Sequence, residues 1–168
     1  MQIVPQMEMK ETGNCQAGEL VRLTWDNMPL AIIAKQNDIF FAVVLEDGQV
    51  GTAPRFLRCD DPTSRVLSYG HQVILQVDQN GPHEIRTNQL HDLNGAIVID
   101  GNRTLMRVGP ARGGRPYSSV YIDLFTGMLT ESPRRDFSTF ASWEISVPIA
   151  GTERTLSLLK FAGAASNG

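Results

Sequence analysis

Cysteine, lysine and long apolar runs are scarce in this sequence of 168 residues. Its two cysteines, Cys15 and Cys59, are too few for a disulfide framework or a zinc-ligand set, so we expect two unpaired thiols, with a single bridge as the alternative. No run approaches the ~18 apolar residues of a membrane-spanning helix, and the N-terminal MQIVPQMEMK has proline and glutamate where a secretion signal needs an apolar stretch. These absences predict a protein without a membrane partner, either cytoplasmic or incorporated into an assembled particle.

The motifs of the common enzyme classes are also missing: no Walker P-loop, dinucleotide fingerprint or G-x-S-x-G elbow occurs. The three histidines fall within 21 residues, among acidic residues, but none of their pairs has the tight local spacing of familiar zinc motifs. We therefore expect no metal and no cofactor, and an enzyme with an unrecognised His/Asp site is kept as an alternative. The residues of that alternative are His71, Asp78, His83, Glu84, His91 and Asp92.

What the sequence does contain is a repeated two-residue alternation of apolar side chains. The apolar fraction of 42% and the charged fraction of 20% are those of a folded, soluble chain. In a strand, residues at i, i+2 and i+4 share one face, so the alternation indicates strands rather than helices. The aligned sets are Val21, Leu23 and Trp25; Val73, Leu75 and Val77; Val120, Ile122 and Leu124; and Trp143, Ile145 and Val147.

Turn-forming residues separate these runs at short intervals. Asn-Gly, Asp-Gly and related pairs supply the positive φ angles that tight hairpins need. The turns are expected at 26–29, 36–38, 46–49, 79–82, 93–95 and 100–102. The fold class predicted is all-β, an antiparallel meander of roughly ten strands that forms a sandwich or two small SH3-like barrels, with at most one or two short helices.

A domain boundary is expected at CDDPTSR, residues 59–65, where charge, proline and small polar residues interrupt the strand pattern. It separates an N-terminal barrel-like unit at 1–60 from a C-terminal β-rich unit at 66–162, with a flexible tail at 163–168. A single β-domain over 1–162 is the alternative.

Two segments also fit a helix. RDFSTFASWEIS could begin at Asp136 as an N-cap, but the alternation up to Val147 and the following Pro148 favour a strand. TERTLSLLKFA places Leu156, Leu159 and Lys160 at helical spacing, and for this segment helix and strand stay equally open.

The charge distribution is more informative than the net charge of −3. Residues 1–102 carry 7 basic against 13 acidic residues (−6), whereas residues 103–135 carry 6 against 2 (+4). The six basic residues of this second block are all arginine, and glycine and proline flank those at its centre. If 103–108 and 117–125 pair as a hairpin, the intervening loop could hold phosphates or an acidic protein surface. The predicted binding residues are Arg107, Arg112, Arg115, Tyr117, Arg134 and Arg135.

These observations favour a noncatalytic protein-binding or assembly module, a homo-oligomeric accessory component of a larger particle, because a −6 and a +4 segment on one chain favour self-association. A β-barrel that binds single-stranded nucleic acid through the arginine loop is the second hypothesis. The acidic remainder of the chain opposes it.

Overall fold

The structure, a computed structural model, describes residues 6–24, 27–46, 54–81, 93–109, 120–130, 133 and 137–162, together with the backbone of 83–85. Its strands are numbered β1 to β15, and over the described ranges one helical element occurs, a single 3₁₀ turn at Thr12–Asn14. The all-β prediction is confirmed. Among the described residues no helix has the length and apolarity that crossing a membrane requires.

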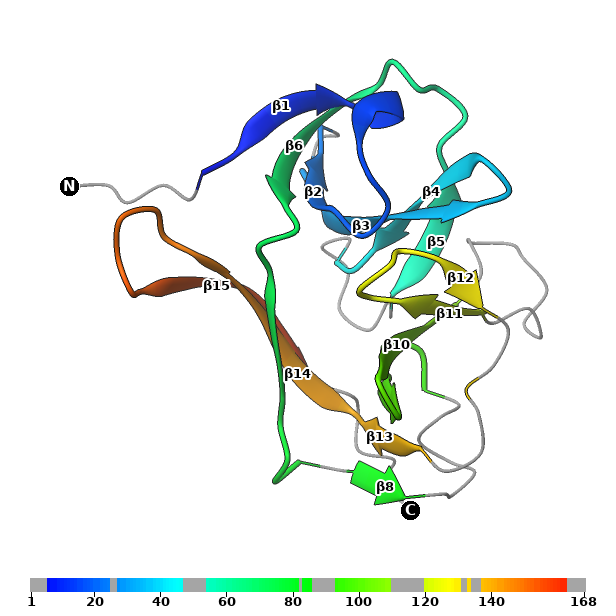
Figure 1. The fold of residues 1–168 in the computed structure, drawn as a ribbon, viewed down its shortest axis with the longest axis vertical. Helices are drawn as coiled ribbons and strands as arrows, with labels where there is room; N and C mark the ends of the chain where they lie inside the picture. Colours follow the sequence, from blue (N-terminus) through cyan, green and yellow to red (C-terminus); the bar gives the residue numbers. More distant parts are fainter. Residues whose placement is uncertain are drawn as a thin grey trace.

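The strands form three antiparallel sheets (Figure 1). The N-terminal sheet has the order β1 (Glu8–Glu11), β6 (Arg65–Gly70), β2 (Leu20–Leu23), β3 (Leu30–Gln36), β4 (Ile39–Val44) and β5 (Arg55–Arg58). The second sheet has the order β12 (Leu129–Thr130), β11 (Val120–Asp123), β10 (Arg103–Val108), β9 (Ile97–Asp100), β13 (Ser138–Phe140) and β8 (His83–Ile85). The third sheet has the order β15 (Thr155–Ala162), β14 (Ser142–Pro148) and β7 (Ile74–Val77).

Two of the expected turns close the tightest hairpins. Asn37 and Asp38 have φ of +48° and +62° between β3 and β4, the positive angles that a two-residue hairpin loop of this hand requires. Gly101 has φ of +60° between the paired ends of β9 and β10. The strands number more than the ten expected, because two- to four-residue strands such as β12 and β8 carry too few residues to show an alternation.

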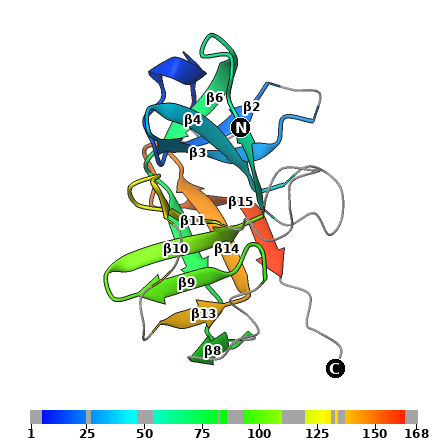
Figure 2. The ribbon, with the colours of Figure 1, turned by 90° about the vertical axis from the view of Figure 1, so that its right-hand side faces the viewer.

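The expected boundary at 59–65 coincides with the loop that joins β5 to β6. However, β6 lies beyond that boundary in sequence and pairs with β1 and β2 in the N-terminal sheet. Figures 1 and 2 show the N-terminal sheet at one end of the molecule, β8 and β13 at the other, and β14 between them. The division into units at 1–60 and 66–162 stays a prediction.

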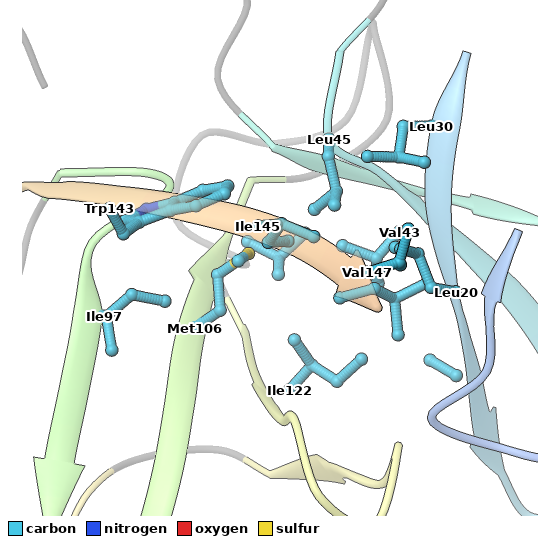
Figure 3. Packing of buried hydrophobic residues seen from close by; sticks show 13 residues of the cluster. Leu20, Leu30, Val43, Leu45, Ile97, Met106, Ile122, Trp143, Ile145 and Val147 are labelled. Atoms are coloured by element: carbon cyan, nitrogen blue, oxygen red, sulfur yellow. The ribbon is translucent and has the colours of Figure 1, made fainter. Parts of the chain in front are cut away.

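The main hydrophobic core is shared by all three sheets (Figure 3). Leu20 and Ile32 come from the N-terminal sheet, Met106 from the second sheet, and Trp143 and Ile145 from β14. The alternation expected for Trp143, Ile145 and Val147 is confirmed, since all three side chains are buried in this cluster. The rest of its buried members are Leu30, Ala34, Val43, Leu45, Ile97, Val108 and Ile122.

The opposite face of the N-terminal sheet packs on a second cluster, which includes Val21, Ile33 and Val66. Cys15 is buried in this cluster and Cys59 packs against it, and both are free thiols as expected. Burial raises the pKa of the Cys15 thiol to about 11 and also raises that of Cys59, so both stay protonated near neutral pH.

Both segments with helical alternatives are strands. The interpretation of RDFSTFASWEIS as strand is confirmed over β13 and β14, and TERTLSLLKFA, left open above, forms β15. Sheet pairing explains the second result, because Trp143 of β14 pairs with Phe161 of β15 and their rings stack with centroids 5.0 Å apart. That contact depends on the pairing of β15 with the preceding strand, which the spacing of apolar residues within 155–162 does not show.

We expect Trp143→Phe to lower the free energy of unfolding by about 2 kcal/mol, because the indole N–H donates a buried hydrogen bond of 2.7 Å to the carbonyl of Gly95. Urea unfolding followed by circular dichroism measures the change. Gln76→Thr, on an exposed position of the neighbouring strand, is the control and should shift the free energy by less than about 0.5 kcal/mol. Equal changes in the free energy of unfolding for the two variants would contradict a stabilising role of the Trp143–Gly95 hydrogen bond.

Candidate functional site

An apolar cavity of about 280 Å³ opens where the turn before β2, the β6–β7 connection and the β11–β12 turn meet; we call it the Phe125 pocket. Its floor is the main core, since Leu20, Ile32 and Ile145 are all nearly inaccessible to solvent. His71 supplies a polar ring to the lining. The lining residues are Gly18, Leu20, Ile32, His71, Val73, Leu75, Leu124, Phe125 and Ile145.

Phe125 stands at the rim of this pocket with 89% of its surface exposed, by far the largest exposure among the large hydrophobic residues that the structure describes. Its backbone is nevertheless fixed. One carboxylate oxygen of Asp123 accepts hydrogen bonds from the N–H groups of Phe125 and Thr126, both 3.0 Å, as short polar side chains do in turns. The Gly127 N–H donates a hydrogen bond of 2.8 Å to the carbonyl of Asp123, which closes the turn. The aromatic ring therefore projects from an ordered backbone.

The β11–β12 turn itself packs against the N-terminal sheet (Figure 1). Gly127 has φ of +67°, and a Cβ at this position would overlap the backbone nitrogen of Gly18. Lys35 N–H donates to the Gly127 carbonyl at 3.0 Å, and Lys35 and Met128 form a parallel bridge. Glycine is required here for two reasons: the left-handed angle and the close approach of the two chains.

A buried carboxylate, that of Glu19, lies between two residues that line the pocket, Gly18 and Leu20. Glu19 is 2% exposed and accepts hydrogen bonds from the Ser68 hydroxyl at 2.6 Å, the Gln16 N–H at 2.9 Å and the Lys10 ammonium at 3.3 Å. Burial alone raises its pKa, but these three donors together outweigh burial, so the pKa lies below its usual value. The Gln16 side-chain oxygen lies 3.3 Å from Nε2 of His71, so the network also positions the histidine ring.

A second, polar cleft of about 360 Å³ lies on the other side of His71. The Ser68 hydroxyl donates to Glu19 and accepts from Gly70 N–H at 3.0 Å, so both of its hydrogen-bonding functions are used within the protein. Lys10 is paired with two glutamates. These groups hold the fold in place rather than forming a nucleophile and its base. The cleft is lined by Gln6, Met7, Glu8, Lys10, Ser68, Tyr69, Gly70, His71, Gln72, Val147, Pro148 and Ala150.

Of the binding residues predicted from the charge pattern, Arg107 is described. It lies half-buried within β10, opposite Tyr121 of β11. The antiparallel pairing of β10 with β11 meets the condition on which the loop hypothesis was stated. Arg107 therefore belongs to the body of the sheet. The other predicted binding residues, Arg112, Arg115, Tyr117, Arg134 and Arg135, lie outside the described residues, so the arginine loop stays a prediction.

The structure does not bring the described histidines of the enzyme alternative, His71 and His83, together. His71 is exposed beside the Phe125 pocket, whereas His83 belongs to β8, at the opposite end of the molecule in Figure 1. His91 lies outside the described residues. Over the described ranges no group of three His, Cys, Asp or Glu side chains is placed to hold a metal ion.

Sequence reasoning missed Phe125, although DLFTG carried a signal. The alternation of Val120, Ile122 and Leu124 ends at Leu124. Phe125 follows directly, so it would point away from the face that these three residues share, just before the Thr126-Gly127 turn. A large aromatic residue inside a turn is unusual, because turns lie at the surface. Glu19 and Gly18 gave no such signal, since their roles depend on Ser68 and on Gly127, which are distant in sequence.

Comparison with known proteins adds no assignment: no family model, curated protein or solved structure matches this chain. Function must therefore be argued from the site itself.

Gly127→Ala should destabilise the protein by about 3 kcal/mol or more, because the added methyl overlaps the backbone at Gly18 in addition to straining φ. Gly151→Ala is the matched control, since Gly151 has a similar φ of +75° with nothing within 4 Å of an added Cβ. It should cost only about 1 kcal/mol. Chemical denaturation of both variants checks the difference. If both lost the same amount, the close contact would not matter for stability.

Acid should weaken the protein partly through Glu19. Because its pKa is lowered in the folded state, the stabilisation is fully present above the unfolded value near 4.5 and is lost as the pH falls through the folded value. Glu19→Gln should be less stable than the wild type at pH 7, and the gap should narrow as the pH falls towards 3. Ser68→Ala, which removes one donor, should move the acid loss of stability to higher pH. Unfolding curves measured between pH 7 and pH 3 test both variants. A stability difference between Glu19→Gln and the wild type that does not change with pH would contradict a stabilising role of the ionised Glu19 carboxylate.

Proposed function

We propose that this protein is a noncatalytic binding module that assembles with other protein chains, including further copies of itself. The observation that carries the proposal is Phe125, an aromatic side chain that is 89% exposed on a hydrogen-bonded turn at the mouth of an apolar pocket. An accessory role in a larger particle would follow from such assembly.

The energetics support this function. A fully exposed phenylalanine gains ~2 kcal/mol when it is buried, and aromatic anchors at the centre of an interface carry much of the energy of protein association. The ordered turn adds to this gain, because a side chain whose backbone is already fixed loses less conformational entropy on binding.

Chemistry around the pocket supports binding rather than catalysis. Ser68, Glu19 and Lys10 are engaged with one another, and His71 faces a glutamine amide. The apolar floor offers dispersion contacts and exclusion of water, which serve recognition. No described feature favours the nucleic-acid or enzyme alternatives over this one.

Sedimentation velocity and native mass spectrometry test the proposal. Across a hundredfold range of concentration at low ionic strength, we expect species heavier than the 18.5 kDa monomer. Added salt should weaken them only in part if apolar contact dominates, whereas a complex held by the −6 and +4 segments alone should dissociate at about 0.5 M salt. Monomer at every concentration would overturn self-association.

A further inference from the structure

Asparagine followed by glycine occurs three times in this sequence, at Asn80-Gly81, Asn94-Gly95 and Asn167-Gly168. The pair is chemically labile, because the backbone nitrogen of the glycine can attack the side-chain amide of the asparagine and no Cβ on the glycine hinders the approach. The structure describes the first two pairs and places them in opposite environments, whereas the third lies outside the described residues. Two identical dipeptides in one fold therefore differ only in what surrounds them.

The Asn80-Gly81 pair lies in an exposed turn. It follows β7, which ends at Val77, and residues 78–80 are all exposed. The backbone N–H of Asn80 donates a hydrogen bond of 2.9 Å to a carboxylate oxygen of Asp78, and water can replace this exposed bond when the turn rearranges. The atoms nearest to a Cβ built on Gly81 belong to the same Asp78 side chain, not to packed backbone. The turn can therefore rotate to bring the Asn80 side chain over the following backbone nitrogen.

The Asn94-Gly95 pair, in contrast, is fixed within the protein. The Gly95 N–H donates to the Arg107 carbonyl at 2.8 Å, and the Gly95 carbonyl accepts from the Trp143 indole at 2.7 Å. Gly95 is buried, and a Cβ on it would overlap the ring of Phe161. The nitrogen of Gly95 cannot turn towards the Asn94 side chain without breaking its hydrogen bond to Arg107. Attack at this pair needs local opening of the fold.

We propose that Asn80 is a site of spontaneous deamidation in the folded protein, and that the fold protects Asn94 from the same reaction. The Gly81 nitrogen loses its proton and bonds to Cγ of Asn80, and the side-chain nitrogen leaves as ammonia, which gives a cyclic imide. Water then opens the imide at one of its two carbonyls, so the product is aspartate or isoaspartate. Overall, one water is added and one ammonia is lost.

Deamidation of Asn80 places a second carboxylate in the turn after β7. It adds one negative charge to a chain whose net charge is −3. The new carboxylate lies two residues from Asp78, and the two like charges repel each other. Isoaspartate also lengthens the backbone by one methylene, so we expect the hydrogen bond from residue 80 to Asp78 to weaken.

Peptide mapping by mass spectrometry measures each rate separately. Trypsin cleaves after lysine and arginine, so Asn80 falls in the peptide 66–86, Asn94 in 87–103 and Asn167 in 161–168. In folded protein held at mildly alkaline pH and body temperature, Asn80 should convert at least about tenfold faster than Asn94, because the open state that Asn94 requires is sparsely populated. In concentrated guanidinium chloride the two rates should become similar, since the local chemistry of the two pairs is the same.

Two variants should each change one of the rates. Gly81→Ala places a methyl group beside the attacking nitrogen and should abolish most of the conversion of Asn80, with Asn94 unchanged. Trp143→Phe removes the hydrogen bond to the Gly95 carbonyl and should raise the rate at Asn94 about 5- to 30-fold, with Asn80 unchanged. If Trp143→Phe does not fold, the wild type in urea below its unfolding transition gives the same comparison, because urea raises the open population.

An isoaspartyl methyltransferase with labelled S-adenosylmethionine supplies an independent readout, and the label should appear in the peptide that contains Asn80. Asn80 that stays unconverted in the folded protein, while both pairs react in the unfolded chain, would overturn the assignment of the site. Equal rates at Asn80 and Asn94 in the folded protein would overturn protection by the fold. A rate at Asn94 that changes neither in Trp143→Phe nor in urea would overturn it as well.

Discussion

The contact between Gly127 and Gly18 is the constraint on which the meeting of the two larger sheets depends. At this point the β11–β12 turn approaches the N-terminal sheet so closely that a Cβ atom at Gly127 would overlap the backbone at Gly18. The backbone hydrogen bond from Lys35 to Gly127 and the bridge between Lys35 and Met128 form as a result. The Phe125 pocket exists because the two turns are held at this separation.

The buried polar network around Glu19, next to Gly18 and Leu20 of the pocket lining, has a complementary role. A carboxylate as enclosed as that of Glu19 is tolerated only when hydrogen-bond donors satisfy it. Its three donors come from separate segments: Lys10 from β1, Gln16 from the turn before β2, and Ser68 from β6. Because the donors converge on one group, they fix the turn that carries Gly18 and the position of His71. Apolar contacts alone would leave these turns less well defined.

Local patterns predicted the parts of this structure that depend on near neighbours. The alternation of Val73, Leu75 and Val77 placed these residues on a partly buried face, and all three pack against the main core. The turns at Asn37-Asp38 and Gly101 were predicted because only a few residue types adopt their φ angles. Arg107 was assigned to a binding surface from the charge pattern, and that role stays a prediction; its position in β10, opposite Tyr121 of β11, is set by strand pairing, which the charge pattern does not contain.

By itself, the sequence determined the β class, the hairpin turns and the burial of alternate side chains, since a period of two and a positive φ are properties of a few adjacent residues. Only the tertiary structure decided that β6 joins the N-terminal sheet, that three sheets share one core, and that Phe125 stands exposed at the mouth of a pocket. Each of these depends on contacts between residues far apart in the chain. Such contacts arise from the packing of whole sheets, and no short window of sequence contains both partners.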